Sequence, residues 1–423
     1  MIKTAIIISS FWGNSKHVGN YRIERFIRWL NKLDYQITLI NSGTRNSFQE
    51  KKWGSLITVK NPFLPKKKFS ENKLNNKKFL SVIKSIISKL VYFWIFIPDS
   101  NILWALLVPY NKIVKKYVDK KADFIISSSP PESDHIAALF LSKKNKTKLI
   151  VDLRDGWLDE PLKPLLKKYA VRRIMERIPE YFVYKNAATI FVTSNEWEKI
   201  LKDRNPSIGK QTRVLTNAYP VNFDFKKDSI SKKNEGNSIS IFHSGRFRLS
   251  SGSRHLSILL DPIILASNNF EFNAKIKLRG EFNGDDLNEL EKMRSKCQPD
   301  KIEILKLDYI ERDLLLNEIK IMDGLLLLST SKYALPSKLF EYIPTSKPLL
   351  IMCPEGSAVW NLCKTLPQAF LFDYTLSNEF HKGNVGVIYD FLMACKHKNF
   401  EVSIPTEFSE DFLFSKFKME INN

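Results

Sequence analysis

The chain has 423 residues, of which 43% are hydrophobic and 26% charged, a balance typical of a globular protein rather than a disordered one. This length accommodates about two or three domains with cores of their own. No run approaches the roughly 18 uncharged apolar residues of a membrane-spanning helix, and the first residues lack a cleavable signal pattern, so we expect a cytoplasmic protein. The four cysteines show no CxxC spacing, which predicts reduced, structural thiols.

The net positive charge lies entirely in the first half of the chain. Residues 1–220 hold 40 Lys and Arg against 18 Asp and Glu, a net +22, whereas residues 221–423 hold 26 against 27, a net −1. A general enrichment in lysine would raise both halves alike, so it does not explain the difference. A basic first half favours an anionic partner: a phospholipid, a pyrophosphate-bearing lipid or a nucleic acid.

Short apolar runs alternate with amphipathic stretches, which predicts an α/β fold with parallel sheets. In the first half, strands are predicted at residues 5–9, 36–40, 124–128, 148–151, 189–193 and 213–215, and helices at 22–33, 113–119, 134–142 and 165–184. In the second half, strands are predicted at residues 238–243, 275–278, 302–305, 324–328, 348–352 and 369–372.

A polar, charged stretch between the halves predicts a linker, and we place the domain boundary near residue 220. Residues 1–220 and 221–395 are then two doubly wound, Rossmann-like domains, and residues 396–423 are a tail that packs back on the first domain. We expect the ligand in a cleft between the facing edges of the two domains.

Residues 60–98 interrupt this pattern. Nine lysines and a single acidic residue lie between residues 60 and 89, and apolar positions from 79 onward recur at helical spacing before an aromatic run. A basic, aromatic-rich amphipathic helix is typical of a membrane interface. The alternative is a core helix behind a solvated lysine loop.

Residues 334–348 form the most informative motif, between two apolar runs that read as strands. Pro336 and Ser337 are typical of a helix start, with Ser337 as a candidate cap, and Lys338 and Glu341 share one face of the first turn. A cation and a carboxylate there suit a phosphate group and the hydroxyls of a ribose. The alternative is an ordinary βαβ unit with surface charges.

Two further strands end in charged residues. The strand at 148–151 is followed by Arg154 and Asp155, which are able to hold an anion and to orient a hydroxyl, or else form an internal ion pair. The strand at 238–243 ends in His243, and Gly245 then permits a tight turn while Arg246 supplies charge for a phosphate.

Together these pieces resemble the GT-B glycosyltransferases of the retaining, GT4-like group, and most of all the bacterial enzymes of capsule, O-antigen and exopolysaccharide assembly. The resemblance covers nearly the whole chain. It is carried by the glycine-bearing loop at 10–20, Ser129-Pro-Pro-Glu-Ser, Asp152-Leu-Arg-Asp-Gly-Trp, Thr216-Asn-Ala-Tyr, His243-Ser-Gly-Arg, and Pro336-Ser-Lys-Leu-Phe-Glu-Tyr with Lys347-Pro348.

The resemblance implies a nucleotide-sugar donor as substrate, no cofactor and no metal, and transfer with retention of configuration. Glu341 would bind the ribose, and Lys338 and Arg246 the diphosphate, with His243, Gly245 and Ser337 in the same site. Asp155 and Arg154 would lie near the donor sugar and the acceptor hydroxyl. The acceptor would be a lipid-linked or oligosaccharide glycan, and the enzyme would be peripheral on the inner face of the plasma membrane.

The chain departs from the family pattern at three positions. Tyr333 stands where many relatives carry a glutamate, Ser346 replaces a glycine, and Gly156 replaces a proline. The change at residue 333 bears on how the donor sugar is held.

Two other functions compete with glycosyl transfer. A sugar-nucleotide epimerase of the same two-domain shape would act on the donor alone, without an acceptor. A basic nucleic-acid-binding protein would bind with an affinity that falls steeply with salt, but the chain lacks a recognisable DNA- or RNA-reading motif.

Overall fold

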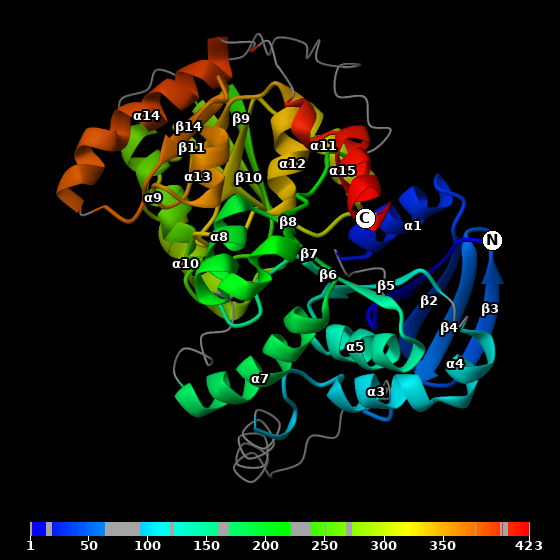
Figure 1. Ribbon diagram of the computed structural model, residues 1–423. Helices are drawn as coiled ribbons and strands as arrows, with labels where there is room; N and C mark the ends of the chain where they lie inside the picture. The colour runs from blue at the N-terminus through cyan, green and yellow to red at the C-terminus, as the bar shows by residue number, and fades with distance from the viewer. Residues whose placement is uncertain are drawn as a thin grey trace, which may run out of the picture. The chain divides into compact units, whose positions relative to one another are not determined.

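The structure of the chain is a computed structural model. It describes residues 2–13, 19–63, 94–118, 122–159, 169–220, 238–249, 251–267, 273–376, 378–397, 400 and 405–422. The chain divides into two units (Figure 1). Unit 1 comprises Met1–Thr193 and Glu198–Leu215, and unit 2 comprises Ser194–Trp197 and Thr216–Asn423.

Unit 1 is built on an eight-stranded sheet of order β3-β4-β2-β1-β5-β6-β7-β8. Its strands are β1 (Thr4–Ile8), β2 (Gln36–Gly43), β3 (Ser47–Lys51), β4 (Gly54–Lys60), β5 (Phe124–Ser129), β6 (Lys148–Leu153), β7 (Thr189–Val192) and β8 (Thr212–Val214). All neighbours pair in parallel except β3 and β4, which form an antiparallel hairpin at the edge. The strand order reverses between β1 and β5, the place where doubly wound sheets bind ligands.

The helices of unit 1 are α1 (Asn20–Asn31), α3 (Ile102–Leu107), η1 (Val108–Tyr110), α4 (Lys112–Tyr117), α5 (Ser133–Asn145), α7 (Ala170–Asn186), α8 (Asn195–Arg204, its first residues in unit 2) and η2 (Pro206–Gln211). Helix α5 packs on β1, β5 and β6 and contacts both α3 and α7. In Figure 1 these three helices lie on one side of the sheet and α1 on the other.

A buried ion pair joins helix α1 to the carboxyl end of this sheet. Arg22 of α1 donates to both carboxylate oxygens of Asp152 at the end of β6, at 2.5–2.9 Å, and to the carbonyl oxygen of Leu215 at 2.8 Å. Ser128 donates to the same carboxylate at 2.7 Å. Burial acts to raise the pKa of Asp152, but the charge and hydrogen bonds of Arg22 hold it below its ordinary value.

Unit 2 is built on a six-stranded, wholly parallel sheet of order β11-β10-β9-β12-β13-β14. Its strands are β9 (Ser238–Ser244), β10 (Asn273–Arg279), β11 (Ile302–Leu307), β12 (Gly324–Leu328), β13 (Leu349–Met352) and β14 (Ala369–Phe372). Its helices are α9 (Leu256–Ser267), α10 (Gly284–Arg294), α11 (Arg312–Lys320), α12 (Ser337–Tyr342), η3 (Ile343–Thr345), α13 (Ala358–Cys363), α14 (Asn378–His397), η4 (Thr406–Phe408) and α15 (Glu410–Asn422).

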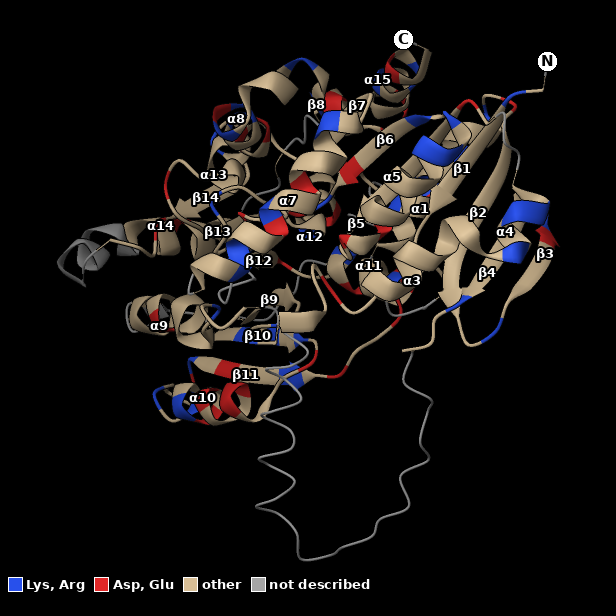
Figure 2. Ribbon diagram, turned by 60° about the horizontal axis from the view of Figure 1, so that its bottom comes forward, with Lys and Arg blue, Asp and Glu red and all other residues tan. Residues whose placement is uncertain are grey.

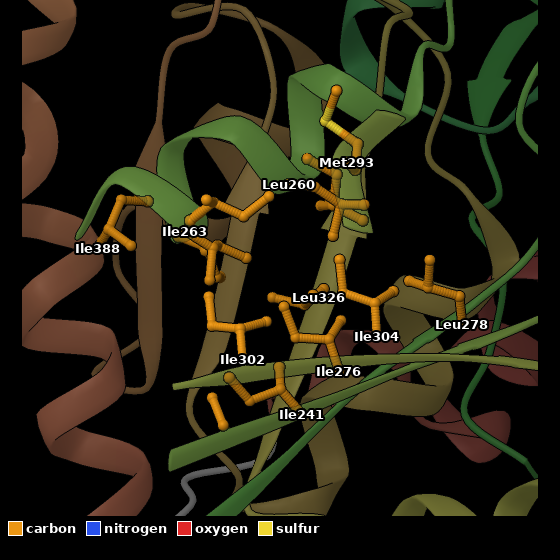
Figure 3. Packing of buried hydrophobic residues seen from close by; sticks show 14 of the residues in the cluster. Ile241, Leu260, Ile263, Ile276, Leu278, Met293, Ile302, Ile304, Leu326 and Ile388 are labelled. Carbon is orange, nitrogen blue, oxygen red and sulfur yellow. The ribbon is translucent and has the colours of Figure 1, made fainter. Parts of the chain in front are cut away.

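Alternate leucines of β12 divide the core of unit 2 into two layers. Leu326 and Leu328 pack with α9, α10 and α14, the layer seen in Figure 3, whereas Leu325 and Leu327 pack with α11, α12 and α13. Because successive side chains of a strand point to opposite faces, a strand covered by helices on both sides is apolar throughout. This arrangement explains the unbroken apolar run of β12.

The predicted fold class is confirmed: both units are α/β with Rossmann-like parallel sheets. Each predicted strand is present, to within a few residues at its ends. The hairpin β3–β4 was not predicted, because its first strand is polar and partly exposed rather than alternating. Helix α3 was not predicted either. Of the predicted amphipathic segment at 60–98, residues 64–93 lie outside the described residues.

Among the helices that the structure describes, none combines the length and the apolar character needed to cross a bilayer. The tail at 396–423 is counted with unit 2, where Phe408 packs against Phe340 at 5.4 Å between ring centroids. Its return to the first domain stays a prediction.

Replacing Arg22 by Met should destabilise the protein by about 3 kcal/mol or more, because it leaves the buried Asp152 carboxylate without its cation. Arg28→Met, on the exposed side of the same helix, is the matched control and should change stability by less than about 0.5 kcal/mol. Urea unfolding measures both. Equal effects would show that the buried pair contributes nothing particular to the fold.

Candidate functional site

The charged side chains of unit 2 gather where its strand order reverses, between β9 and β12. His243, the second-last residue of β9, donates from Nδ1 to the carbonyl oxygen of Leu326 in β12, at 2.9 Å. Since a carbonyl only accepts, Nδ1 carries the proton and Nε2 is left as an acceptor. Within the described residues, Nε2 is buried and has no hydrogen-bond partner. Burial, followed by the charge of Lys338, lowers the pKa of His243 to about 3, so the ring is neutral.

Gly245 brings the loop after β9 against Lys338. Its φ of +149° is one that glycine adopts readily, and its N–H donates to the carbonyl oxygen of Arg279 at 2.8 Å. A Cβ at Gly245 would collide with the Lys338 ammonium and lie 3.4 Å from His243 Nε2. Because Gly245 has no side chain, the Lys338 ammonium is able to lie close to the backbone there, beside the imidazole nitrogen.

Lys338 lies in the first turn of α12, partly buried. Burial lowers its pKa to about 7, with further lowering by the nearby charges of Arg254 and Arg246 and an opposing effect of Glu341. A site that depresses the pKa of an ammonium in this way favours an anion, because a bound anion would restore the charged form.

Arg254 is the second partly buried cation. It donates to the carbonyl oxygen of Leu328, the last residue of β12. Its Nε is buried and, in the described part of the chain, makes no hydrogen bond. Arg254 precedes α9 and was not among the predicted site residues. Its charge lies close enough to Lys338 to lower the pKa of the lysine.

Arg246 lies at the exposed edge of this group. It pairs with Glu281 at 2.6 Å, and both side chains are about half exposed. The three cations thus range from partly buried to exposed, and together they suit a group with two negative charges.

Glu341 is buried on α12 and is not a surface charge. It is 7% exposed and accepts a hydrogen bond from Arg312 Nε at 2.9 Å. Arg312, the first residue of α11, carried no signal in the sequence. Ser337 is the first residue of α12, exposed, while Pro336 is the N-cap and no side chain caps the helix. The predicted cap at Ser337 is therefore wrong.

Tyr333 has a structural role of its own in unit 2. Its ring lies 5.3 Å from that of Trp197, and its carbonyl oxygen accepts from Ser194 at 2.5 Å. Where the family pattern has a carboxylate, this chain therefore has an aromatic contact.

In unit 1, Arg154 and Asp155 lie just after β6. Arg154 donates to the carbonyl oxygens of Ser129 and Pro130, at 2.8 and 2.7 Å, and its guanidinium lies 5.1 Å from the ring of Phe11. Burial lowers its pKa, and the charge of Asp155 acts in the opposite sense. Arg154 therefore holds the turn after β5 in place, and the partly buried Asp155 lies close enough to interact with its charge.

His135 has a structural role in unit 1. It is fully buried on α5, and its Nδ1 lies 2.7 Å from the hydroxyl of Ser127. Burial lowers its pKa to about 3. Beside it, Asp134 accepts from the Ser10 backbone N–H at 2.8 Å, and burial raises the pKa of this carboxyl well above its usual range.

Gly245→Ala should destabilise unit 2 by about 1–3 kcal/mol, because it combines an unfavourable φ with the collision at Lys338. In the Lys338→Ala background Gly245→Ala should destabilise the unit less, since only the unfavourable φ remains. Gly252→Ala, with no atom within 4 Å of the new Cβ, is the control. An unchanged cost in the Lys338→Ala background would place the ammonium elsewhere.

No protein-family model and no curated protein matches the sequence. Solved structures do match the fold. OtsA in its apo form has a TM-score of 0.62 at 9% identity, over 100% of this chain and 99% of that one. HepE of Anabaena, in complex with UDP, has a TM-score of 0.58 at 13% identity, over 99% of both chains. A glycosyltransferase of Rickettsia africae has a TM-score of 0.55 at 12% identity, over 99% and 98%. At this identity the likeness shows the fold: two Rossmann-like domains of the GT-B class.

Proposed function

We propose that the protein is a glycosyltransferase that moves a sugar from a nucleotide-sugar donor to a glycan acceptor. The observation that carries the proposal is the group of cations at the β9–β12 crossover, where Lys338 and Arg254 are partly buried beside a glycine and a neutral imidazole. A diphosphate matches this group in charge and in its many acceptor oxygens. The likeness in fold to nucleotide-sugar enzymes supports the same conclusion.

The cations of this group would act mainly on the leaving diphosphate. As the bond from the anomeric carbon to the diphosphate oxygen breaks, negative charge grows on that oxygen, and fixed cations in a partly dehydrated site stabilise it. The acceptor oxygen forms the new bond to the anomeric carbon, and its proton passes to the departing phosphate. We propose front-face transfer with retention, in which Lys338, Arg254 and Arg246 provide the neutralising charge without a metal.

Glu341 is proposed to accept hydrogen bonds from the ribose hydroxyls. Its Oε1 is held by Arg312, which fixes the carboxylate in one orientation. Ser337, Gly245 and His243 complete the donor site, with His243 Nε2 as an acceptor for a sugar hydroxyl.

The acceptor is proposed to bind on unit 1, where Asp155 and Arg154 lie, and to be a lipid-linked glycan of bacterial surface polysaccharide biosynthesis. The net charge of +22 in residues 1–220 supports a partner rich in phosphate, such as a lipid diphosphate at the cytoplasmic face of the membrane.

The first test is a thermal-shift screen with UDP-, GDP-, dTDP- and CMP-sugars, followed by assay of nucleotide release with a lipid-linked acceptor. Structures of HepE hold UDP and UDP-glucose, which makes UDP-glucose the first probe. Release that needs the acceptor and survives EDTA supports a metal-free transferase. Conversion of the donor without any acceptor would favour the epimerase instead, and no binding of any donor contradicts both.

The affinity for UDP-glucose should fall as pH rises above about 7. Lys338, whose pKa is lowered to about 7, carries its charge below that pH, and the sugar-linked diphosphate keeps its two charges across the range. The loss should approach tenfold per pH unit until the higher pKa of Lys338 in the complex is reached. Calorimetry between pH 6 and 9 measures it.

Lys338→Arg should remove this pH dependence, because arginine stays charged, and Lys338→Met should weaken binding roughly tenfold or more. Lys364→Met, an exposed lysine in the same unit, is the control. A steep pH profile that persists in Lys338→Arg would assign the titration to another group.

Glu341→Gln should weaken UDP-glucose binding by roughly tenfold, because an amide accepts hydrogen bonds from hydroxyls less strongly than a carboxylate does. Glu303→Gln removes an exposed ion pair with Lys275 and should leave binding unchanged. Equal affinities for the two variants would remove Glu341 from the donor site.

A further inference from the structure

Helix α7 of unit 1 buries Arg172 and both of its carboxylates. Arg172 pairs with Glu176 at 2.7 Å, with side chains 4% and 2% exposed. One turn later, the nearly buried Glu180 pairs with Arg204 at 2.7 Å. This is the reverse of an ordinary surface helix, in which charged residues face the solvent.

The outward side of α7 is apolar. Its exposed side chains recur at intervals of three and four residues and so form one stripe, the α7 face: Val171, Ile174, Met175, Ile178, Tyr181 and Phe182. Each is 39–61% exposed. Single exposed apolar residues are common on proteins, but a continuous stripe is typical of an interaction surface.

The charges that α7 does expose are all positive. Arg177 and Lys185 are exposed, and the partly accessible Arg173 pairs with Asp159 at 3.3 Å. Both acidic residues of the helix, Glu176 and Glu180, are instead buried in ion pairs. Figure 2 shows both signs of charge on α7. The two signs of charge therefore lie on different sides of the helix: cations border the α7 face, and the carboxylates point into the protein.

Helix α3 extends the apolar surface. Its exposed side chains are Leu103, Leu106 and Leu107, followed by Tyr110 in η1, again at helical spacing. Both α3 and α7 contact α5, and all three lie on the same side of the sheet (Figure 1). Trp94 and Ile95, also exposed, precede Phe96 and Pro98, whose carbonyl oxygens accept from Arg172.

We propose that the α7 face docks on the surface of an anionic lipid bilayer. A bilayer offers acyl chains beside phosphate groups, which matches an apolar stripe bordered by cations. A second copy of the chain is a poorer match, because two α7 faces would bring like charges together without a carboxylate between them. The inference rests on the proposed function, since it names the surface that would bring a lipid-linked acceptor to unit 1.

The test is co-sedimentation of the full chain with vesicles of phosphatidylglycerol and phosphatidylcholine, without any nucleotide. Ile174→Gln with Ile178→Gln should lower the partition coefficient at least tenfold. Arg177→Gln with Lys185→Gln should lower it about fivefold or more on anionic vesicles and leave the weak binding to neutral vesicles unchanged. Leu265→Gln with Ile321→Gln, which removes two apolar side chains exposed on unit 2, is the matched control and should bind as the parent does.

Three results would overturn the proposal. The first is equal sedimentation of the parent and the variant with Ile174→Gln and Ile178→Gln. The second is a dimer of the parent in solution that this variant dissociates without loss of vesicle binding. The third is a variant that melts far below the parent, which would mean that the chain itself covers the α7 face. UDP-glucose calorimetry on the same proteins separates the two hypotheses: retained donor binding with failed vesicle binding contradicts only this inference, and the opposite result contradicts only the proposed function.

Discussion

The candidate donor site depends on the approach of the Lys338 ammonium to the backbone at Gly245. Any side chain at residue 245 would occupy the position of that ammonium, and the imidazole of His243 borders the same space. The charge of Lys338 is thus held at the end of the central strands, in a place where burial makes the uncharged form accessible near neutral pH. A bound anion would provide the negative charge that stabilises the charged form of Lys338.

The two units treat buried charge differently. In unit 1 the buried ions are matched: Arg22 with Asp152, and Arg172 with Glu176. Such pairs contribute little net stability but fix one geometry, because breaking them leaves an uncompensated charge. In unit 2 the exposed Arg246 pairs with Glu281, and Glu341, whose charge acts on Lys338, is bonded to Arg312. The cation group there therefore carries an excess of positive charge.

Much of the fold could be predicted from the sequence, because the buried parallel strands are short apolar runs, of which β12 is the clearest. The polar strand β3 carried no such signal. For the candidate site, the sequence located Lys338, Glu341 and Gly245, since glycine and charge after an apolar run mark strand ends. It missed Arg312. It could not reveal that the apolar stripe of α7 faces outward, because a helix with its apolar side exposed has the same sequence periodicity as one with that side buried.

Gly280, at the end of β10, lies against the carbonyl group of Gly245, so two bare backbones meet where side chains normally separate neighbouring loops. Gly280, which has no side chain, thus determines how closely the backbone at Gly245 approaches β10. Exchange of Gly280 for even a methyl-bearing residue would displace the loop at Gly245. The shape of the candidate site can therefore be changed through the backbone alone, with the side chains of Lys338 and His243 unchanged.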